Sequence, residues 1–256
     1  MRNMNLLFWQ IGIVLLFEMI DIFLLLCFFN FVSDSRLPRR QIVILSAIIC
    51  VCKAIISIIS VNFLHLDITF IFLIFFFLSL PMILDHYSGL SIKLFFGIFS
   101  MVVVNIFLRF MTFFICPLFN IDTKEVNNNY LSLYFFDYLS IIVSFYFVKL
   151  FSYDFNSWKV NLDSKVGKLL LNTINISMII YFVIIQLLTM VQFSNINIDT
   201  SNPRKIIVLF YLFLFFSLLA IIDRNVKNNL YQEILSQKEK QLIDLSNYSR
   251  QIEKII

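Results

Sequence analysis

The stretch NPRKIIVLFYLFLFFSLLAIIDRNVKNNLYQEILSQKEKQLIDLSNYSRQIEKII (residues 202–256) decides the fold, because an apolar half runs into a charged half with no helix breaker between them. Asn202 and Pro203 form a favourable helix start, since asparagine caps a first turn and proline is tolerated at its first position. No Gly or Pro follows Pro203. We therefore expect one continuous helix of about 80 Å at 1.5 Å per residue.

The rest of the chain is as apolar as the first half of that stretch. Hydrophobic residues make up 60% of the 256 residues, and charged residues only 14%. A soluble domain needs more polar surface than this, so the composition indicates a polytopic membrane protein in contact with a lipid bilayer. The net charge of +4 is too small and too dispersed to indicate binding of nucleic acid.

Seven apolar runs are each near the ~20 residues needed to cross about 30 Å of hydrocarbon. They cover about 6–32, 42–64, 68–84, 94–117, 131–151, 169–193 and 204–222. The expected fold is all-α: a polytopic membrane helical bundle of about seven spans in residues 1–223, continuing into a cytoplasmic coiled-coil helix in residues 224–256. Only LHLD separates the second run from the third, so one bent or re-entrant segment there would reduce the count to six.

The positions of Lys and Arg predict the orientation in a bacterial cell membrane. If the N-terminus is outside, the external segments carry Arg2, Lys124, Arg204 and Lys205. The cytoplasmic side then carries the larger set, which is Arg36, Arg39, Arg40, Lys93, Lys149, Lys159, Lys165, Lys168, Arg224 and Lys227. This imbalance favours an N-terminus outside and a C-terminus in the cytoplasm.

The segments 65–67, 120–130 and 194–202 would then face the exterior, and they are Asn-rich and mildly acidic. One interpretation is that they are ordinary solvated turns. The other is a shallow recognition surface for an extracellular ligand. The candidate ligand-binding residues are Asp67, Asp122, Glu125, Asn128, Tyr130 and Asp199.

Five ionisable residues fall inside the apolar runs, where each costs a few kcal/mol and normally faces a partner or water. Glu18 and Lys53 lie near the middle of their spans and could meet there, whereas Arg109 and Asp137 lie roughly 9–12 Å below the external surface. One interpretation is that such pairs fix the helix register. The other is that they couple a signal through the bundle; the candidate signal-coupling charges are Glu18, Asp21, Lys53, Arg109 and Asp137.

No metal site and no catalytic residue is expected. The two histidines, His65 and His86, are predicted on opposite membrane faces, and no third ligand stands at helical spacing. Cys116 should lie near the outer face, too far from His86 for nucleophilic catalysis. The cysteines are expected to be small buried hydrophobic residues, namely Cys27, Cys50, Cys52 and Cys116.

Beyond the last span, residues at alternating spacings of four and three form a predominantly apolar stripe, which predicts a parallel homodimeric coiled coil. The predicted dimer seam is Tyr231, Leu235, Leu242, Leu245, Ile252 and Ile256, with polar interruptions at Lys238 and Ser249. The alternative is an amphipathic helix lying on the membrane surface. Such a helix should be markedly basic, whereas acidic residues here almost equal basic ones.

A multi-span domain with short loops that ends in this kind of helix resembles the sensor half of the peptide-pheromone receptor histidine kinases of Gram-positive bacteria, the ComD/AgrC quorum-sensing group. The terminal match consists of Gln241, Leu242, Leu245, Tyr248, Ile252 and Glu253. The resemblance implies that a dimerisation helix with a phospho-accepting His and an ATP-binding domain follow this type of helix. It also implies a cytoplasmic response regulator as the partner of that kinase module.

The chain itself carries neither a phospho-accepting His in the required setting nor an ATP-binding motif. The resemblance therefore implies ATP and Mg only for the kinase module, and no cofactor for this chain. The expected function is a membrane receptor that binds an extracellular signalling peptide and transmits the signal through its last span. The alternative is a multi-span transporter or a bacteriocin immunity membrane protein, although the scarcity of Gly counts against Gly-broken helices lining a transport path.

Overall fold

The computed structural model describes residues 2–64, 69–84, 89–119, 121, 130–151, 153, 155, 157–158, 165–193 and 201–253, and these residues form helices and no strand. The long helices are α1 (Arg2–Ser33), α2 (Arg39–Leu64), α3 (Thr69–Leu84), α4 (Leu90–Phe110), α7 (Tyr130–Leu150), α9 (Lys165–Phe193) and α10 (Ser201–Glu253). A π-helical turn, η1 (Met111–Ile115), and the short helix α5 (Cys116–Leu118) continue α4. The prediction of an all-α fold is confirmed.

Six of these helices are long and apolar enough to cross a membrane, and the exception among the long helices is α3. With 16 residues, α3 is about 24 Å long at 1.5 Å per residue, short of the ~30 Å hydrocarbon layer. The predicted second and third runs are thus two separate helices, α2 and α3, rather than one long bent segment. The chain is a polytopic membrane helical bundle.

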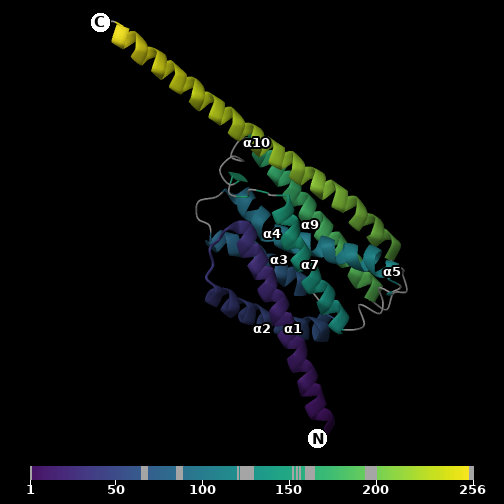
Figure 1. Ribbon diagram of the computed structural model, residues 1–256. Helices are drawn as coiled ribbons and strands as arrows, with labels where there is room; N and C mark the ends of the chain where they lie inside the picture. The colour runs from purple at the N-terminus through teal and green to yellow at the C-terminus, as the bar shows by residue number, and fades with distance from the viewer. Residues whose placement is uncertain are drawn as a thin grey trace.

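Helix α4 lies at the centre of the bundle, where it contacts α1, α3, α7, α9 and α10 (Figure 1). Its side chains are buried on most of its circumference, which is why its sequence shows no polar face. Gly97 allows a close approach of α4 to α3. A Cβ atom there would lie 2.5 Å from the Phe77 carbonyl oxygen of α3, so any larger residue would push the two helices apart.

Aromatic rings fill the centre of the bundle. The Phe99 ring of α4 lies 6.5 Å from that of Phe28 in α1, 5.4 Å from that of Phe155 and 6.0 Å from that of Phe215 in α10, measured between centroids. Inside a bilayer, apolar side chains gain little by leaving lipid, so helices associate through close packing. The many Phe residues of this sequence provide that packing through tilted and edge-on ring contacts.

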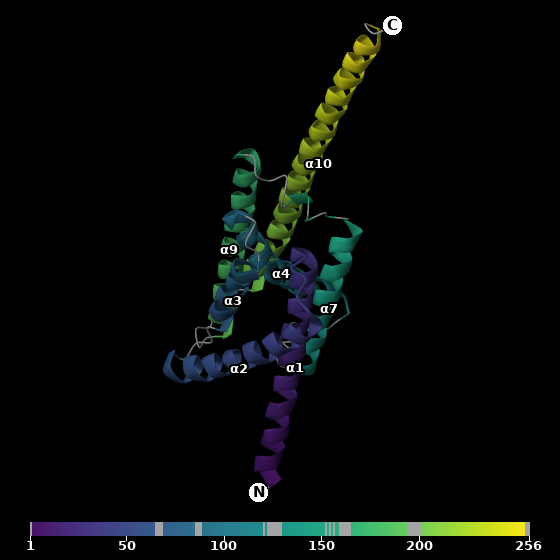
Figure 2. The same ribbon diagram turned by 90° about the vertical axis from the view of Figure 1, so that its left-hand side faces the viewer.

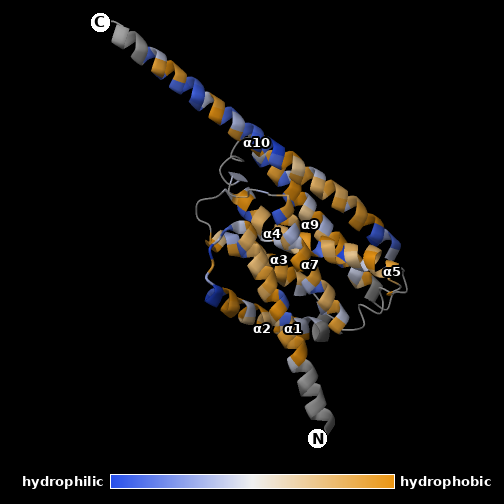
Figure 3. Ribbon diagram, in the orientation of Figure 1, coloured by the Kyte–Doolittle hydropathy of each residue, from blue (hydrophilic) through white to orange (hydrophobic). Residues whose placement is uncertain are grey.

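Helix α10 is continuous from Ser201 to Glu253 and extends far beyond the other helices (Figure 1). It starts before the predicted cap, Asn202, which lies within its first turn. Its buried side chains recur every three or four residues and end at Val226; they are Val208, Tyr211, Phe215, Leu219, Ile222 and Val226. Figure 3 shows the matching change from an apolar first half to a mixed second half. The predicted single helix is confirmed, and residues 227–253 are called the α10 tail below.

Helices α1 and α2 are joined by a short turn that leaves them in contact, with α2 running across the lower part of the bundle (Figure 2). The Asn30 side chain closes this turn, because its Oδ1 atom accepts hydrogen bonds from the Leu37 amide and the Ser35 hydroxyl, both at 2.8 Å. Asp34 and Arg36 adopt left-handed backbone conformations, with φ of 48° and 54°. The turn thereby sets which residues of α1 and α2 face one another.

Candidate functional site

Glu18 of α1 and Lys53 of α2 form an ion pair inside the bundle. Helix α2 crosses α1 after the short turn, and this crossing brings the two residues together (Figure 2). Their side chains are 24% and 23% exposed, which makes the pair half-buried. The structure thus joins the two residues whose depths suggested that they could meet.

Two tyrosines of α7 complete the surroundings of this pair. The Tyr134 hydroxyl donates a hydrogen bond to Glu18 Oε1 at 3.0 Å, and the Tyr138 hydroxyl donates to the Phe17 carbonyl oxygen at 2.9 Å. The Tyr134 ring also stacks on Phe17, with centroids 5.3 Å apart. The sequence analysis did not identify either tyrosine. Tyr134 stands three residues before Asp137, so helical spacing puts the two residues on the same face of α7.

Asp21 and Asp137 lie near the ion pair, and Arg109 lies near Asp137. Asp21 lies one helical turn after Glu18 and is close enough to interact electrostatically with Asp137, Lys53 and Glu18. Asp137 interacts in the same way with Arg109. The sequence suggested two pairs at two depths, whereas the structure places all five residues in one group. This charge cluster consists of Glu18, Asp21, Lys53, Arg109 and Asp137.

The charge cluster holds more carboxylates than cations. Its acidic members are Glu18, Asp21 and Asp137, and its basic members are Lys53 and Arg109. Within the described residues, Arg109 and Asp137 form no ion pair, and the buried Arg109 Nε atom has no hydrogen-bond partner. The same part of the chain holds no group of three residues able to bind a metal ion. The cluster is therefore incompletely paired, which is unusual for charges in a membrane span.

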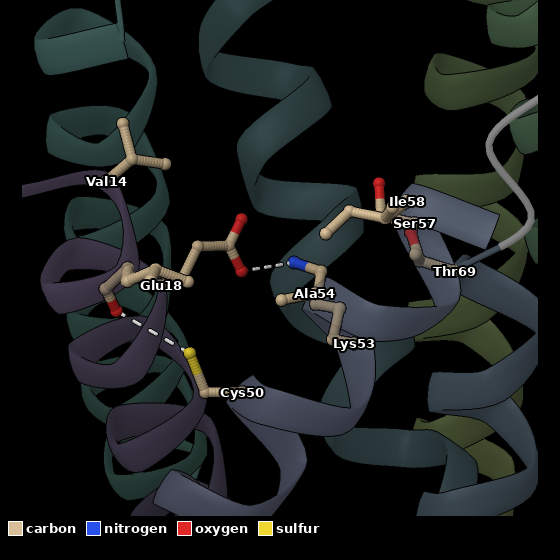
Figure 4. A pocket seen from close by; sticks show the side chains of 9 residues that line it. Val14, Glu18, Cys50, Lys53, Ala54, Ser57, Ile58 and Thr69 are labelled. Carbon is tan, nitrogen blue, oxygen red and sulfur yellow. Dashed lines mark hydrogen bonds and ion pairs between the residues drawn. The ribbon is translucent and has the colours of Figure 1, made fainter. Parts of the chain in front are cut away.

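A cavity of about 340 Å³ opens beside the ion pair, between α1, α2 and the start of α3. In Figure 4 the side chains of Glu18 and Lys53 extend toward each other across it. Leu15, Cys50 and Ile58 are among the other lining residues. We call this space the lateral cavity.

The π-helical turn η1 begins two residues after Arg109, and Pro117 gives a physical reason for it. In a regular α-helix the proline ring would collide with the carbonyl of Phe113, and the wider π turn avoids this collision. The Cys116 amide bonds to the Met111 carbonyl, five residues back. Thr112 Oγ1 donates to the Arg109 carbonyl at 3.2 Å. The prediction placed Pro117 correctly at the end of an apolar run but gave no sign of the π turn.

Arg204 at the start of α10 is buried, with only 2% of its surface exposed. Its guanidinium carbon lies 5.1 Å from the centroid of the Phe113 ring in η1, and its Nη1 atom donates to Thr189 Oγ1 of α9 at 3.5 Å. The sequence places Arg204 on the external side at the start of the last apolar run, but it gave no sign that this side chain is buried in the bundle. The delocalised charge of the Arg204 guanidinium is attracted to the face of the Phe113 ring. Counting the charges in loops cannot reveal a contact of this kind.

A second contact joins α10 to the region of Arg109. The Tyr211 ring stacks on the Tyr181 ring of α9, with centroids 4.1 Å apart and planes inclined by 7°. The Tyr181 hydroxyl donates to Asn105 Oδ1 of α4 at 3.3 Å and lies close enough to Arg109 to interact electrostatically. The first half of α10 is therefore attached at two levels to α4 and α9.

Five of the six predicted ligand-binding residues lie outside the described residues: Asp67, Asp122, Glu125, Asn128 and Asp199. The sixth, Tyr130, begins α7, but its side chain is not described.

Of the predicted dimer seam, Ile256 lies outside the described residues and Ile252 lies in α10. The remaining seam side chains are between 43% and 66% exposed: Tyr231, Leu235, Leu242 and Leu245. The four cysteines are free, and Cys50 and Cys116 are buried as expected.

Comparisons with protein-family models, with curated proteins and with solved structures find no match to this chain. The fold and composition define the class, which is a polytopic all-α membrane protein.

Proposed function

We propose that the chain is the membrane sensor of a peptide-pheromone receptor histidine kinase, with its N-terminus outside and its C-terminus in the cytoplasm. An extracellular peptide binds at the external loops, and α10 transmits the signal to a kinase module that acts on a response regulator. The observation that carries this proposal is the continuity of α10. One helix runs from a start buried against α9 and η1 to a tail whose side chains are exposed from Leu230 to Asn247.

The α10 tail supports dimerisation. Tyr231, Leu235, Leu242 and Leu245 are exposed along one face, and Ile234, 43% exposed, lies beside that face by helical spacing. A helix that carries an apolar stripe into water needs a partner to cover it. A second copy of the tail, aligned in parallel, presents the complementary stripe and places two kinase modules side by side.

The phase of the coiled coil provides the test. Residues 1–256 are fused to a histidine-kinase core with a reporter, and residues are inserted between Ser236 and Gln237. Two extra residues rotate the following helix by about 200°, whereas seven extra residues restore its phase to within about 20°. We expect the seven-residue insertion to preserve the reporter level and the two-residue insertion to change it; equal output from both would refute transmission through α10.

The peptide class is tested with the same fusion. The probe is the secreted peptide fraction of the source bacterium's own culture, added before and after protease digestion. We expect a change in reporter output that digestion abolishes. A response that survives complete proteolysis would contradict a peptide ligand.

Cysteine crosslinking tests the dimer separately. Leu242→Cys and Leu245→Cys are compared with Lys240→Cys, the matched control on the opposite face by helical spacing, in membranes of the cysteine-free chain. We expect disulfide-linked dimers at the first two positions only. Preferential crosslinking at position 240 would show that the stripe does not form the interface.

A transporter is the second candidate, because the lateral cavity places charged groups inside the bundle. Such a function needs the cavity but not the α10 tail. Truncation after Gln237 separates the two candidates: signalling output should be lost, whereas uptake or efflux by a transporter would persist.

A further inference from the structure

The lateral cavity has the dimensions of a binding site for a small molecule. Its volume of about 340 Å³ lies at the lower end of the ~300–1,000 Å³ typical of ligand pockets. A site of this size accommodates a molecule comparable to one capped amino acid rather than a whole peptide. It is therefore distinct from the external surface to which the proposed function assigns the signalling peptide.

The cavity is apolar at its edge and charged further inside. Leu15 of α1 and Ile58 of α2 are 40% and 63% exposed, and both belong to helices that can cross the membrane. Glu18 and Lys53 are only 24% and 23% exposed. Because both helices are candidate membrane spans, this exposed edge would face acyl chains in a bilayer, which gives a dissolved molecule a sideways route of entry.

The polar groups of the cavity offer unused donors rather than acceptors. Both Glu18 oxygens already accept hydrogen bonds, from Tyr134 and from Lys53. The ammonium group of Lys53 carries three N–H donors, and among the described residues it bonds only to Glu18. The hydroxyl of Ser57, which also lines the cavity, has no partner within the same described part of the chain.

The route of entry determines which acceptor fits. An anion would have to leave water for the hydrocarbon layer to reach the cavity from the side, which costs several kcal/mol. A neutral carbonyl oxygen accepts from Lys53 without adding charge. A neutral molecule also partitions into the bilayer from which the cavity opens.

We propose that the lateral cavity binds a neutral, apolar amide that enters from the bilayer. Its carbonyl oxygen accepts hydrogen bonds from Lys53 and Ser57, and its apolar body packs on Leu15, Ala54 and Ile58. This inference does not depend on whether the chain signals or transports.

The test uses the full chain in lipid nanodiscs and a diazirine analogue of N-acetyl-leucinamide as photoprobe. We expect crosslinks to map to residues 14–18 and 50–58. Unlabelled N-acetyl-leucinamide should compete with the probe, whereas N-acetyl-leucine, which carries a carboxylate, should not. Competition by the carboxylate at equal concentration, or crosslinks elsewhere, would overturn the proposal.

Three substitutions that leave both residues of the ion pair in place sharpen the result. Ala54→Phe fills the cavity and should abolish the specific crosslink, whereas Ile55→Phe adds the same ring at a residue outside the cavity lining that is 51% exposed and should not. Ser57→Ala removes one hydrogen-bond donor. It should weaken the competition of unlabelled N-acetyl-leucinamide with the photoprobe about fivefold, the effect of roughly one hydrogen bond. Labelling that persists unchanged in Ala54→Phe would refute binding in this cavity.

Discussion

The ion pair in the bundle predicts an asymmetric response to removal of either partner. Lys53→Met leaves Glu18 with its Tyr134 hydrogen bond but without a cation, while Asp21 and Asp137 remain close. An unpaired charge in the middle of a span costs about 3 kcal/mol. Because the pair is half-buried rather than fully enclosed, we expect Lys53→Met to lower the free energy of unfolding by about 3 kcal/mol and not more.

Glu18→Gln has a smaller expected effect, because Lys53 keeps two carboxylates nearby, those of Asp21 and Asp137. The loss is then mainly that of the Glu18 hydrogen bonds, about 1 kcal/mol. The two substitutions should thus differ by about 2 kcal/mol in the unfolding free energy that they remove. This difference measures how far the remaining carboxylates, Asp21 and Asp137, replace Glu18 as partners of Lys53. Neutralising both partners together should cost less than Lys53→Met alone.

The measurement is reversible unfolding of the chain in mixed micelles, followed by circular dichroism as the denaturing detergent fraction rises. Lys227→Met is the control, because it breaks the exposed pair with Asp223, in which the side chain of Lys227 is 65% exposed. Such surface pairs contribute about 0–1 kcal/mol. The reasoning fails if Glu18→Gln destabilises the chain as much as Lys53→Met does.

Three further predictions concern packing and the π turn. Gly97→Ala should destabilise the bundle by about 1–3 kcal/mol, because its Cβ would collide with α3, whereas Gly89→Ala meets open space and should cost almost nothing in the same unfolding assay. Pro117→Ala removes the reason for the π turn, so the thiol of Cys116, now 1% exposed, should react faster with maleimide; an unchanged rate would contradict this account of η1. Arg204→Gln should cost about 1–2 kcal/mol through loss of the cation–π contact with η1, and an effect below about 0.3 kcal/mol would show that this contact does not stabilise the start of α10.

Composition and periodicity were sufficient to predict the membrane class and the helical bundle. The absence of Gly and Pro after Pro203 predicted the single helix α10, since nothing else in the stretch breaks a helix. Depth along each span also predicted that Glu18 and Lys53 could meet, because both residues lie near the middle of their apolar runs.

Contacts that depend on position around the bundle were not predictable in this way. Depth gives no information on which helix lies beside which, so the gathering of Asp21, Asp137 and Arg109 around the ion pair was missed. The π turn results from a steric conflict at Pro117 that spacing rules treat as a helix end. The burial of Arg204 depends on the ring of Phe113, which belongs to another helix.

The geometry of α10 sets the size of movement that the proposed receptor needs. Its contacts with the bundle end near Val226, and the segment from there to Glu253 is about 40 Å long at 1.5 Å per residue. A tilt of only about 5° at Val226 displaces Glu253 by about 3.5 Å, more than the ~1–2 Å helix shifts that switch many allosteric proteins. The tilt requires no break in the helix, because the pair Asp223–Lys227, at 2.6 Å, supports the turn where α10 leaves the bundle. A rigid tilt of about 5° around Val226 also moves Arg204, which lies about 33 Å away along α10, by about 3 Å, so the proposed signal requires the contact between Arg204 and η1 to repack.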